Sequence, residues 1–398
     1  MSAPHVTGIG LLAPTGMGVE QYWSATLAGA CGIGKVTRFD TAGYPAVLAG
    51  EVDGFEAREH LSSRMLPQTD HMTRMALVAS DWALADAGVK PDELPDFAAG
   101  VVTASSAGGF EFGHRELEAL WSKGSDHVSA YQSFAWFYAV NTGQISIRQG
   151  LRGPGGVVVT EQSGGLDVLA MARRRLRDGA ELMLAGGVDS GLCPWGWVAQ
   201  IASDRLSYRD DPARAYLPFD TDATGFVPGE GGAILVVEND VRPGARSYGT
   251  IAGHASTFDP PAGSGRPGTL RRAIENALAD AGADAAEVDV VFADAAGVPE
   301  LDRAEAVAIT EVFGPVPVTA PKAGVGRLYS GGASLDVVAA LLAIRDEVVP
   351  PTPNVARLAP GIDLDLVVGR PRHKKIRTAL VVARGYGGYN SAVVLRAS

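Results

Sequence analysis

The chain has 398 residues, of which 46% are hydrophobic and 20% are charged, and its formal net charge is −11. A chain of this length can bury a large core in one or two domains, and its negative charge argues against a nucleic-acid binder. The two cysteines, Cys31 and Cys193, are too few for a disulfide framework, which favours a cytoplasmic location.

The sequence has no pattern that is typical of a membrane-bound or a metal-binding protein. No apolar run is long enough to cross a bilayer, and the first residues do not have the pattern of a secretory signal. The seven histidines do not pair with carboxylates or cysteines at metal-ligand spacing. We therefore expect no membrane contact and no metal site.

The first predicted element is an apolar strand at residues 6–12. Residues 8–13 formally fit a relaxed dinucleotide-binding fingerprint, but Pro14 follows and no helix start is evident behind it. A bound pyrophosphate needs the N-terminus of a helix at this place. We interpret the segment as a glycine-bearing strand and turn.

The rest of the chain alternates between strand-like and helical patterns, which predicts an α/β fold. The strand-like runs are 100–103, 157–160, 182–188, 233–237, 288–292, 378–382 and 392–395. The helical patterns are 73–87, 166–177, 270–281, 303–312 and 335–345. Residues 239–247, with Pro243 and Gly244, are the best candidate for a join between two halves, at 1–240 and 241–398.

Residues 157–165 have the pattern of a strand–turn–helix elbow. Such an elbow can project one side chain into a pocket and direct a helix N-terminus at it, which stabilises negative charge there. The tip is Gln162, whose amide is not a nucleophile for acyl transfer. We interpret Ser163 as a structural residue at the helix start, because no histidine has the context of a catalytic base. The motif Ser163-Gly164-Gly165 also has an echo at residues 330–332, which fits two similar halves.

Further glycine-rich segments follow in a defined order: 218–220 with 225–232, then 322–328, then 384–390. Together with the elbow, these segments resemble the β-ketoacyl synthase family over nearly the whole chain. The resemblance implies a duplicated, thiolase-type, five-layer αβαβα sandwich.

The resemblance also assigns positions to the catalytic groups. Gln162 stands at the position of the nucleophilic cysteine, and Lys322 matches the family's active-site lysine. Asp294 and Arg327 stand at the positions of the two histidines. Because the thiol and both imidazoles are replaced, we expect no condensing activity from this chain alone.

Within the family, residues 67–70, 133–144 and 189–197 are similar to the chain length factors, the β subunits of aromatic type II polyketide ketosynthases. The similarity implies a heterodimer with an active ketosynthase α subunit and no cofactor in this chain. Malonyl units would arrive on the phosphopantetheine of an acyl carrier protein, and the chain would grow in a tunnel at the subunit interface.

The resemblance places the chain-length gate on a helix that contains Phe110, Gly113 and Leu117. Their spacing of three and four puts them on one helical face. Because Gly113 and Leu117 are of modest size, we expect a tunnel that is roomier than an octaketide needs. The interface is expected at the aromatic run 134–138, which consists of Phe134, Trp136, Phe137 and Tyr138 around Ala135.

Other readings stay open at this point. Gln162 has a structural role in the first reading, and in the second it assists decarboxylation of malonyl thioester to prime the complex. A free-standing acyl-transfer enzyme would use Ser163 or Cys193, although Cys193, beside Pro194 and Trp195, fits a buried apolar contact better. A homodimeric binding protein is the third possibility.

Overall fold

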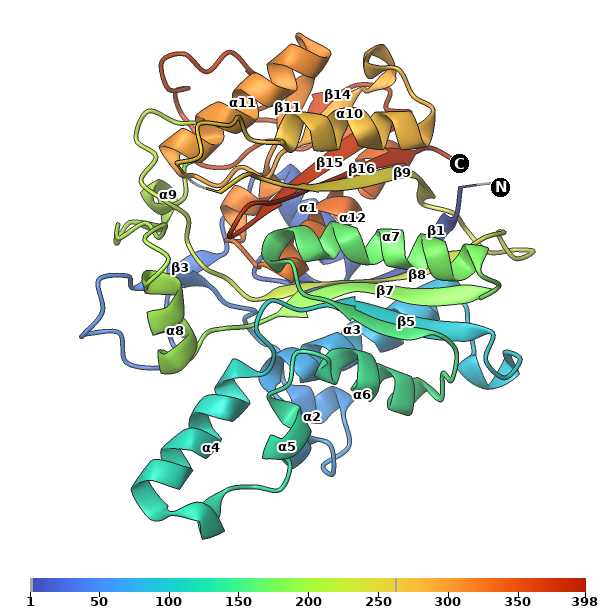
Figure 1. The fold of residues 1–398 in the computed structure, drawn as a ribbon, viewed down its shortest axis with the longest axis vertical. Coiled ribbons are helices and arrows are strands. Elements are labelled where there is room, and N and C mark those ends of the chain that lie inside the picture. Colours follow the sequence, from blue (N-terminus) through green and yellow to red (C-terminus); the bar gives the residue numbers. More distant parts are fainter. Residues whose placement is uncertain (1–2, 262) are drawn as a thin grey trace.

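The computed structural model describes residues 3–261 and 263–398, and it shows five layers in the order helix, sheet, helix, sheet, helix (Figure 1). The first half supplies the strands β1 (His5–Ala13), β5 (Ala99–Ala104), β6 (Gly155–Val158), β7 (Leu182–Asp189) and β8 (Gly231–Glu238). The second half supplies β9 (Gly249–Phe258), β10 (Val290–Phe292), β11 (Pro317–Thr319), β13 (Asp365–Leu366), β15 (Thr378–Gly385) and β16 (Tyr389–Arg396).

These strands form a continuous mixed sheet in the order β13-β11-β10-β15-β16-β9-β1-β8-β7-β5-β6. Strand β1 connects the halves, because it pairs with β8 along most of its length and with β9 only through His5 and Val6. The sheet therefore folds into two layers at β1. The thiolase-type sandwich predicted from the resemblance is confirmed.

Two helices, α7 (Gly164–Arg177) and α12 (Ser330–Asp346), fill the layer between the two sheet layers. Nearly every residue of α12 is buried, as expected for a helix that is apolar on all sides. One outer face is covered by α3 (His71–Ala87) and α6 (Val140–Gln149), and the other by α10 (Leu270–Ala281) and α11 (Pro299–Phe313). The side chains accordingly form separate apolar cores, one in the middle layer and one under each outer layer.

Most predicted elements are present, with shifts that have local causes. The prediction for α10 is confirmed in both bounds, whereas α3 and α11 begin earlier than predicted because Asp70 caps α3 and Pro299 occupies the first position of α11. The sequence patterns do not predict strand β9, since none of the residues 254–258 in its second half is buried. Residues 239–247 contain neither helix nor strand and connect β8 to β9.

Strand β6 ends at Val158, two residues before the end of the predicted run 157–160. It pairs in parallel with β5, and the last pair is Ala104 with Val158. Thr160 then leaves the extended region, with φ −134° and ψ 32°, and Glu161 has a φ of 52°. In the described part of the chain, the other edge of β6 is unpaired.

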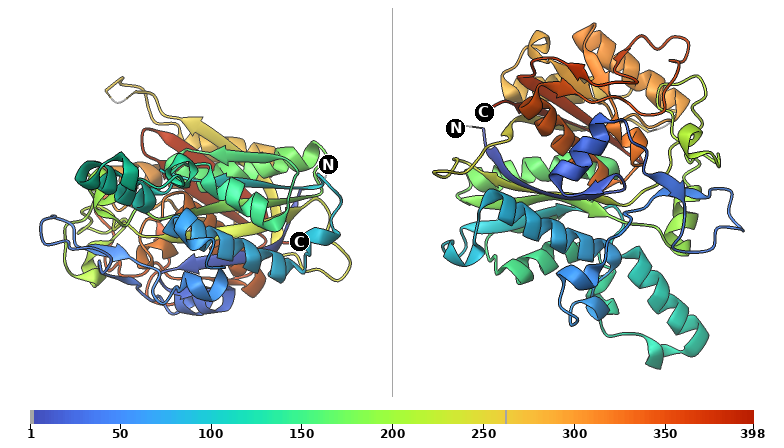
Figure 2. Two further views of the ribbon diagram at one scale, coloured as in Figure 1. Left: turned by 90° about the horizontal axis from the view of Figure 1, so that it is seen from below. Right: turned by 180° about the vertical axis from the view of Figure 1, so that it is seen from behind.

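A lobe of α4 (Phe110–Lys123) and α5 (Gln132–Ala135) extends away from the layered body (Figures 1 and 2). The sequence patterns did not predict either helix, but the resemblance implied the helix that carries Phe110. Within residues 3–261 and 263–398, none of the helices has the length and apolarity needed to span a membrane.

Candidate functional site

The turn after β6 forms a tight elbow. Glu161 holds a left-handed backbone conformation, and the short 3-10 turn η4 (Glu161–Ser163) leads directly into α7. Such a conformation costs a residue other than glycine about 1–3 kcal/mol and is typical of functional sites. Two side chains leave the elbow in different directions: Glu161 lines a cavity, and Gln162 is fully buried.

The side chain of Gln162 faces α12. A Cβ atom at Gly332 would lie 2.9 Å from the amide Nε2 and 3.0 Å from Oε1, so the glycine makes room for this amide. Neither amide atom has a hydrogen-bond partner among the described residues. Gln162 is absent from the lining of the cavity, which differs from the expectation that this residue projects into an open pocket.

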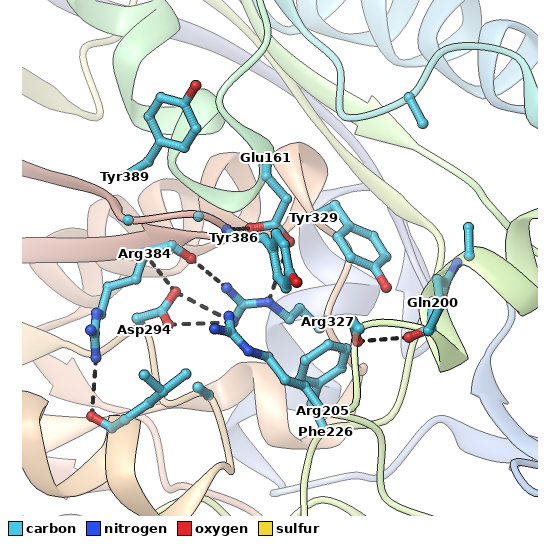
Figure 3. Close-up of a pocket in the computed structure, with 18 of the residues that line it drawn as sticks. Glu161, Gln200, Arg205, Phe226, Asp294, Arg327, Tyr329, Arg384, Tyr386 and Tyr389 are labelled. Atoms are coloured by element: carbon cyan, nitrogen blue, oxygen red, sulfur yellow. Dashed lines mark hydrogen bonds and ion pairs between the residues drawn. The ribbon is translucent and has the colours of Figure 1, made fainter. Parts of the chain in front are cut away.

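The cavity has a volume of about 400 Å³ and lies between the elbow, the start of α4 and the turn that connects β15 to β16 (Figure 3). Aromatic rings form much of its wall: Phe110, Phe226, Tyr329, Tyr386 and Tyr389. Among the described residues that line it there is no cysteine and no histidine. The cavity thus has the size of a ligand site but lacks a thiol or imidazole.

Asp294 and Arg327 meet in this cavity as a buried ion pair. The guanidinium Nη1 lies 3.3 Å from Asp294 Oδ2, and Nε lies 3.7 Å from Glu161 Oε1. The backbone N–H of Arg384 donates to Asp294 Oδ1 at 2.9 Å, and Nη2 of Arg327 donates to the carbonyl oxygen of Arg384. The two residues that the resemblance places at the histidine positions therefore form an ion pair with each other (Figure 3).

The electrostatic environment keeps both side chains of this pair ionised. Burial alone would raise the pKa of Asp294, but the Arg327 guanidinium, together with Lys322 and the backbone N–H of Arg384, outweighs it and holds that pKa below its usual range. Burial would lower the pKa of Arg327, but the carboxylates of Asp294 and Glu161 raise it. Neither group can exchange a proton near neutral pH, which general acid–base catalysis requires.

Lys322 lies in the 3-10 turn η6 (Pro321–Gly324), directly before the loop that carries Arg327. Its Nζ atom is 2.6 Å from Asp336 Oδ2 on α12, and both side chains are buried. Burial raises the pKa of Asp336 to about 6, although Lys322 opposes this shift. The retained lysine is thus neutralised by a partner of its own and does not line the cavity.

The two alternative nucleophiles are poorly placed. The Ser163 hydroxyl donates to the carbonyl oxygen of Thr160 at 2.7 Å and does not cap α7, although Ser163 is the residue at the helix start. Cys193 is buried at the start of α8 (Pro194–Ile201), and burial raises the pKa of its thiol to about 11. These environments argue against acyl transfer by either side chain.

The three candidate gate residues lie on α4, as the resemblance implied. Phe110 lines the cavity, Gly113 is buried, and Leu117 is 37% exposed. A Cβ atom at Gly113 would lie 3.1 Å from Cζ3 of Trp195. The space beside Gly113 is thus filled by an indole from α8.

The sequence patterns do not connect Trp195 with the candidate gate residues. Its ring stacks on Phe110 with centroids 4.8 Å apart and an interplanar angle of 26°. The two residues are 85 positions apart, because the stack joins α4 to α8. The glycine at position 113 could have indicated that a bulky side chain packs against this helix, but a glycine does not show which residue that is.

The aromatic run 134–138 lies at and after α5. Phe134 packs against the core beneath α3, whereas Trp136, Phe137 and Tyr138 are 43%, 39% and 40% exposed. An exposed aromatic cluster of this kind marks a binding surface. As for metals, residues 3–261 and 263–398 hold no group of three histidine, cysteine or acidic side chains placed to bind an ion.

Two family models match the chain. The β-ketoacyl synthase N-terminal domain matches residues 5–241, and the C-terminal domain matches residues 248–356.

Similar proteins cover the full chain. The tetracenomycin polyketide synthase ketoacyl synthase beta subunit of Streptomyces glaucescens is 60% identical over 406 residues, which are 100% of this chain and 99% of the relative. The actinorhodin polyketide putative beta-ketoacyl synthase 2 of Streptomyces coelicolor is 59% identical over 98% of both chains.

Solved structures agree with these sequence relatives. The ishigamide ketosynthase/chain length factor has a TM-score of 0.91 at 27% identity, with both chains fully covered. A type II polyketide synthase acyl-carrier protein in complex with its ketosynthase bound to the hexaketide has a TM-score of 0.88, also at 27% identity and with both chains fully covered.

Proposed function

This chain belongs to the β-ketoacyl synthase family and is of the chain length factor type, and on that premise we propose that it is the non-condensing β subunit of a type II polyketide ketosynthase heterodimer. An active ketosynthase α subunit supplies the cysteine and the imidazoles. An acyl carrier protein delivers malonyl units on its phosphopantetheine arm. This chain completes the tunnel in which the product grows.

The buried ion pair of Asp294 and Arg327 carries the proposal. Decarboxylative condensation needs neutral imidazoles that can donate a hydrogen bond or hold a proton, and a nucleophile that accepts the acyl group. A carboxylate and a guanidinium that are locked together can do neither. The chemistry must therefore come from another subunit.

The exposed aromatic residues and the free edge of β6 support a partner surface on one side of the molecule. Trp136, Phe137 and Tyr138 precede α6, and Thr142 on α6 donates to the Gly156 carbonyl of β6 at 2.8 Å. Unpaired sheet edges and exposed aromatic clusters are features that proteins normally cover. The ketosynthase α subunit is the proposed cover.

The chain-length gate is proposed at Phe110, Gly113 and Leu117. A growing chain stops where a side chain blocks its path, since overpacking costs about 1–3 kcal/mol per misfit. With Trp195 already beside Gly113, a larger residue at 113 would displace the indole. Leu117, which is partly exposed, has room for a larger side chain and is the cleaner position for a test.

We expect the variant Leu117→Trp, coexpressed with the ketosynthase α subunit and its carrier protein, to release shorter polyketides. The matched control is Arg115→Trp, which lies two residues away on the opposite face of α4. Mass spectrometry of the released products measures the chain length. Products of wild-type length from Leu117→Trp, at normal heterodimer yield, would rule out this gate.

For Gln162, we propose a structural role in which the amide fills the space that Gly332 leaves. The alternative role is decarboxylation of malonyl thioester to prime the complex. The two roles differ in a direct assay for carbon dioxide release from malonyl-carrier protein by this chain. Release that is lost in Gln162→Ala would establish the alternative, and no release would support the structural role.

A further inference from the structure

Asp70 is a buried carboxylate at the start of α3 that the proposed function does not use. Its side chain is buried, and its residue is only 2% exposed. The Oδ1 atom accepts from the backbone N–H of Met72 at 2.8 Å and thereby caps α3. The Oδ2 atom accepts from the backbone N–H of Phe112 on α4, also at 2.8 Å. One carboxylate therefore caps two helices, and its second donor lies 42 positions further along the chain.

The helix α4 lacks a side-chain cap of its own. Its N-cap residue is Gly109, which has no side chain to offer an acceptor. Aspartate is among the best capping residues, and an anion at a helix N-terminus is also stabilised by the helix dipole. Burial and the neighbouring Glu111 carboxylate raise the pKa of Asp70 to about 6, so the group is largely ionised at neutral pH. The start of α3 thus supplies α4 with an anionic cap.

The glycine at position 109 allows the carboxylate to come this close. A Cβ atom at Gly109 would lie 2.9 Å from the Cβ atom of Asp70 and 2.3 Å from the carbonyl oxygen of Ala135. The start of α4 is therefore packed between the start of α3 and the end of α5. The same glycine that removes the local cap makes room for the remote one.

The turn that this carboxylate caps carries two of the three candidate gate residues. Phe110 and Gly113 are the first and fourth residues of α4. The helix packs mainly on α5 and α8, in the lobe that extends away from the layered body (Figure 1). A second tie of the turn is the ion pair of Glu111 with Arg38, which is weak because the N–O distance is 3.6 Å and the Glu111 side chain is 42% exposed. The buried hydrogen bond to Asp70 is therefore the stronger of the two ties.

We propose that Asp70 is a positioning residue for chain length. By capping α4 it fixes Phe110 and Gly113 relative to the layered body, and it thereby fixes the free width of the tunnel at the gate. This inference rests on the proposed function, because it needs a gate on α4. Without the hydrogen bond to Phe112 the chain still folds, but the first turn of α4 is no longer held, and the products become less uniform in length.

The test replaces Asp70 by serine in the heterodimer with the ketosynthase α subunit. Serine is also a good helix cap, but its single side-chain oxygen serves α3 and leaves the N–H of Phe112 without an acceptor. In Asp70→Ser, hydrogen exchange of the backbone at 110–116 should become at least about tenfold faster, which corresponds to the loss of one hydrogen bond to a charged group. Exchange in α3 should stay as in the wild type. Mass spectrometry should find a larger share of products whose length differs from that of the main wild-type product.

The matched control is Asp289→Ser. Asp289 Oδ2 also accepts from two backbone N–H groups, those of Arg377 at 2.8 Å and Thr378 at 3.2 Å, but it lies in the second half of the chain. This variant should leave both the exchange at 110–116 and the product lengths unchanged. A role of Asp70 in capping α3 alone would make Asp70→Ser behave like this control.

Unchanged exchange at 110–116 in Asp70→Ser would overturn the positioning role, and so would faster exchange with unchanged product lengths. If the serine variant does not assemble, Asp70→Asn replaces it, because the amide has nearly the same shape but one acceptor fewer. Exchange at 110–116 and product length must then change together or not at all, and a change in one alone would overturn the proposal. Leu117→Trp in the same assay separates this failure from that of the proposed function. If it shortens the products, the gate stands without Asp70, and if it does not, the gate itself is wrong.

Discussion

The pair of Asp294 and Arg327 shows how single residues can remove a catalytic activity without unfolding the site. Burying two charged side chains away from solvent is costly. The cost is tolerated here because the backbone of Arg384 makes a hydrogen bond with each of the two side chains. The pair therefore occupies the two positions that the resemblance assigns to imidazoles, and each member has a hydrogen-bond partner in the backbone of Arg384. Loss of one member should be far more harmful than loss of both.

We predict that Arg327→Leu destabilises the chain by about 3–5 kcal/mol, because it removes the ion-pair partner of the buried Asp294 carboxylate. The double variant Asp294→Asn with Arg327→Leu should recover most of this loss. Urea denaturation of the variants measures the change in the free energy of unfolding. A double variant as unstable as the single one would show that the charges themselves are not the cause.

At the scale of elements, α11 organises the loop that carries Asp294. Asp302 accepts from the N–H groups of Phe219 at 2.7 Å and Gly297 at 2.9 Å. Glu305 accepts from the N–H groups of Asp294 at 2.6 Å and Ala295 at 2.8 Å. Burial raises the pKa of Asp302 to about 8 and that of Glu305 to about 7.

These raised pKa values predict a stability that falls as the pH rises. Between about pH 4 and pH 8 the folded chain keeps protons that the unfolded chain has released, so each such group costs up to about 1.4 kcal/mol per pH unit. Asp302→Asn should lower the stability at pH 5, where it loses an acceptor, and should reduce the slope toward pH 8. Urea unfolding at several pH values measures the slope, and a slope unchanged by Asp302→Asn would contradict this assignment.

The contact of α7 with α12 depends on the glycine at position 165, near the start of α7. A Cβ atom at Gly165 would lie 2.4 Å from the carbonyl oxygen of Ser330 and 2.6 Å from the amide nitrogen of Ser334. Backbone atoms cannot yield as a flexible side chain can. The glycine at 165 in the first motif therefore has a packing reason, because it lets α7 approach the backbone at the start of α12 in the middle layer.

We predict that Gly165→Ala destabilises the chain by about 1–3 kcal/mol through overpacking. The matched control is Gly143→Ala on α6, where an added Cβ atom would meet nothing within 4 Å. That control should be neutral or stabilising by up to about 1 kcal/mol, since alanine favours a helix. Thermal unfolding compares the two variants. Similar losses for both would show that close packing is not the reason for the glycine at 165.

At the scale of the whole molecule, the layered fold could be predicted because its helices and strands have strong periodic patterns. Helix α10 is amphipathic and was predicted in both bounds, and α12 is apolar enough to indicate a buried layer. The lobe of α4 and α5 could not be predicted from patterns, since its helices are short or mostly polar and gain stability from tertiary contacts.

The site was predictable in its chemistry but not in its contacts. The identities at 162, 294 and 327 indicated the missing catalytic groups. The contacts of the site depend on residues far away in the sequence, such as Gly332 for Gln162 and Trp195 for Gly113. The direction of Gln162 also required the structure, because one left-handed residue at 161 turns the elbow.

The proposed heterodimer makes a prediction for the whole surface around 134–138. Phe137 is 39% exposed and lies next to Tyr138, with ring centroids 4.2 Å apart. An arginine in its place would bring an unpaired charge into an apolar interface, which costs several kcal/mol. We predict that Phe137→Arg reduces co-purification with a tagged ketosynthase α subunit at least about tenfold.

The control is Tyr208→Arg, which also replaces an exposed aromatic ring, 47% exposed, outside the proposed interface. Size-exclusion chromatography distinguishes the heterodimer from its separate subunits in both variants. Because the arginine at position 137 weakens the interface, the Phe137→Arg chain should elute separately from the ketosynthase α subunit. The Tyr208→Arg chain should elute as the complex. A Phe137→Arg chain that still elutes with its partner would place the interface elsewhere on the molecule.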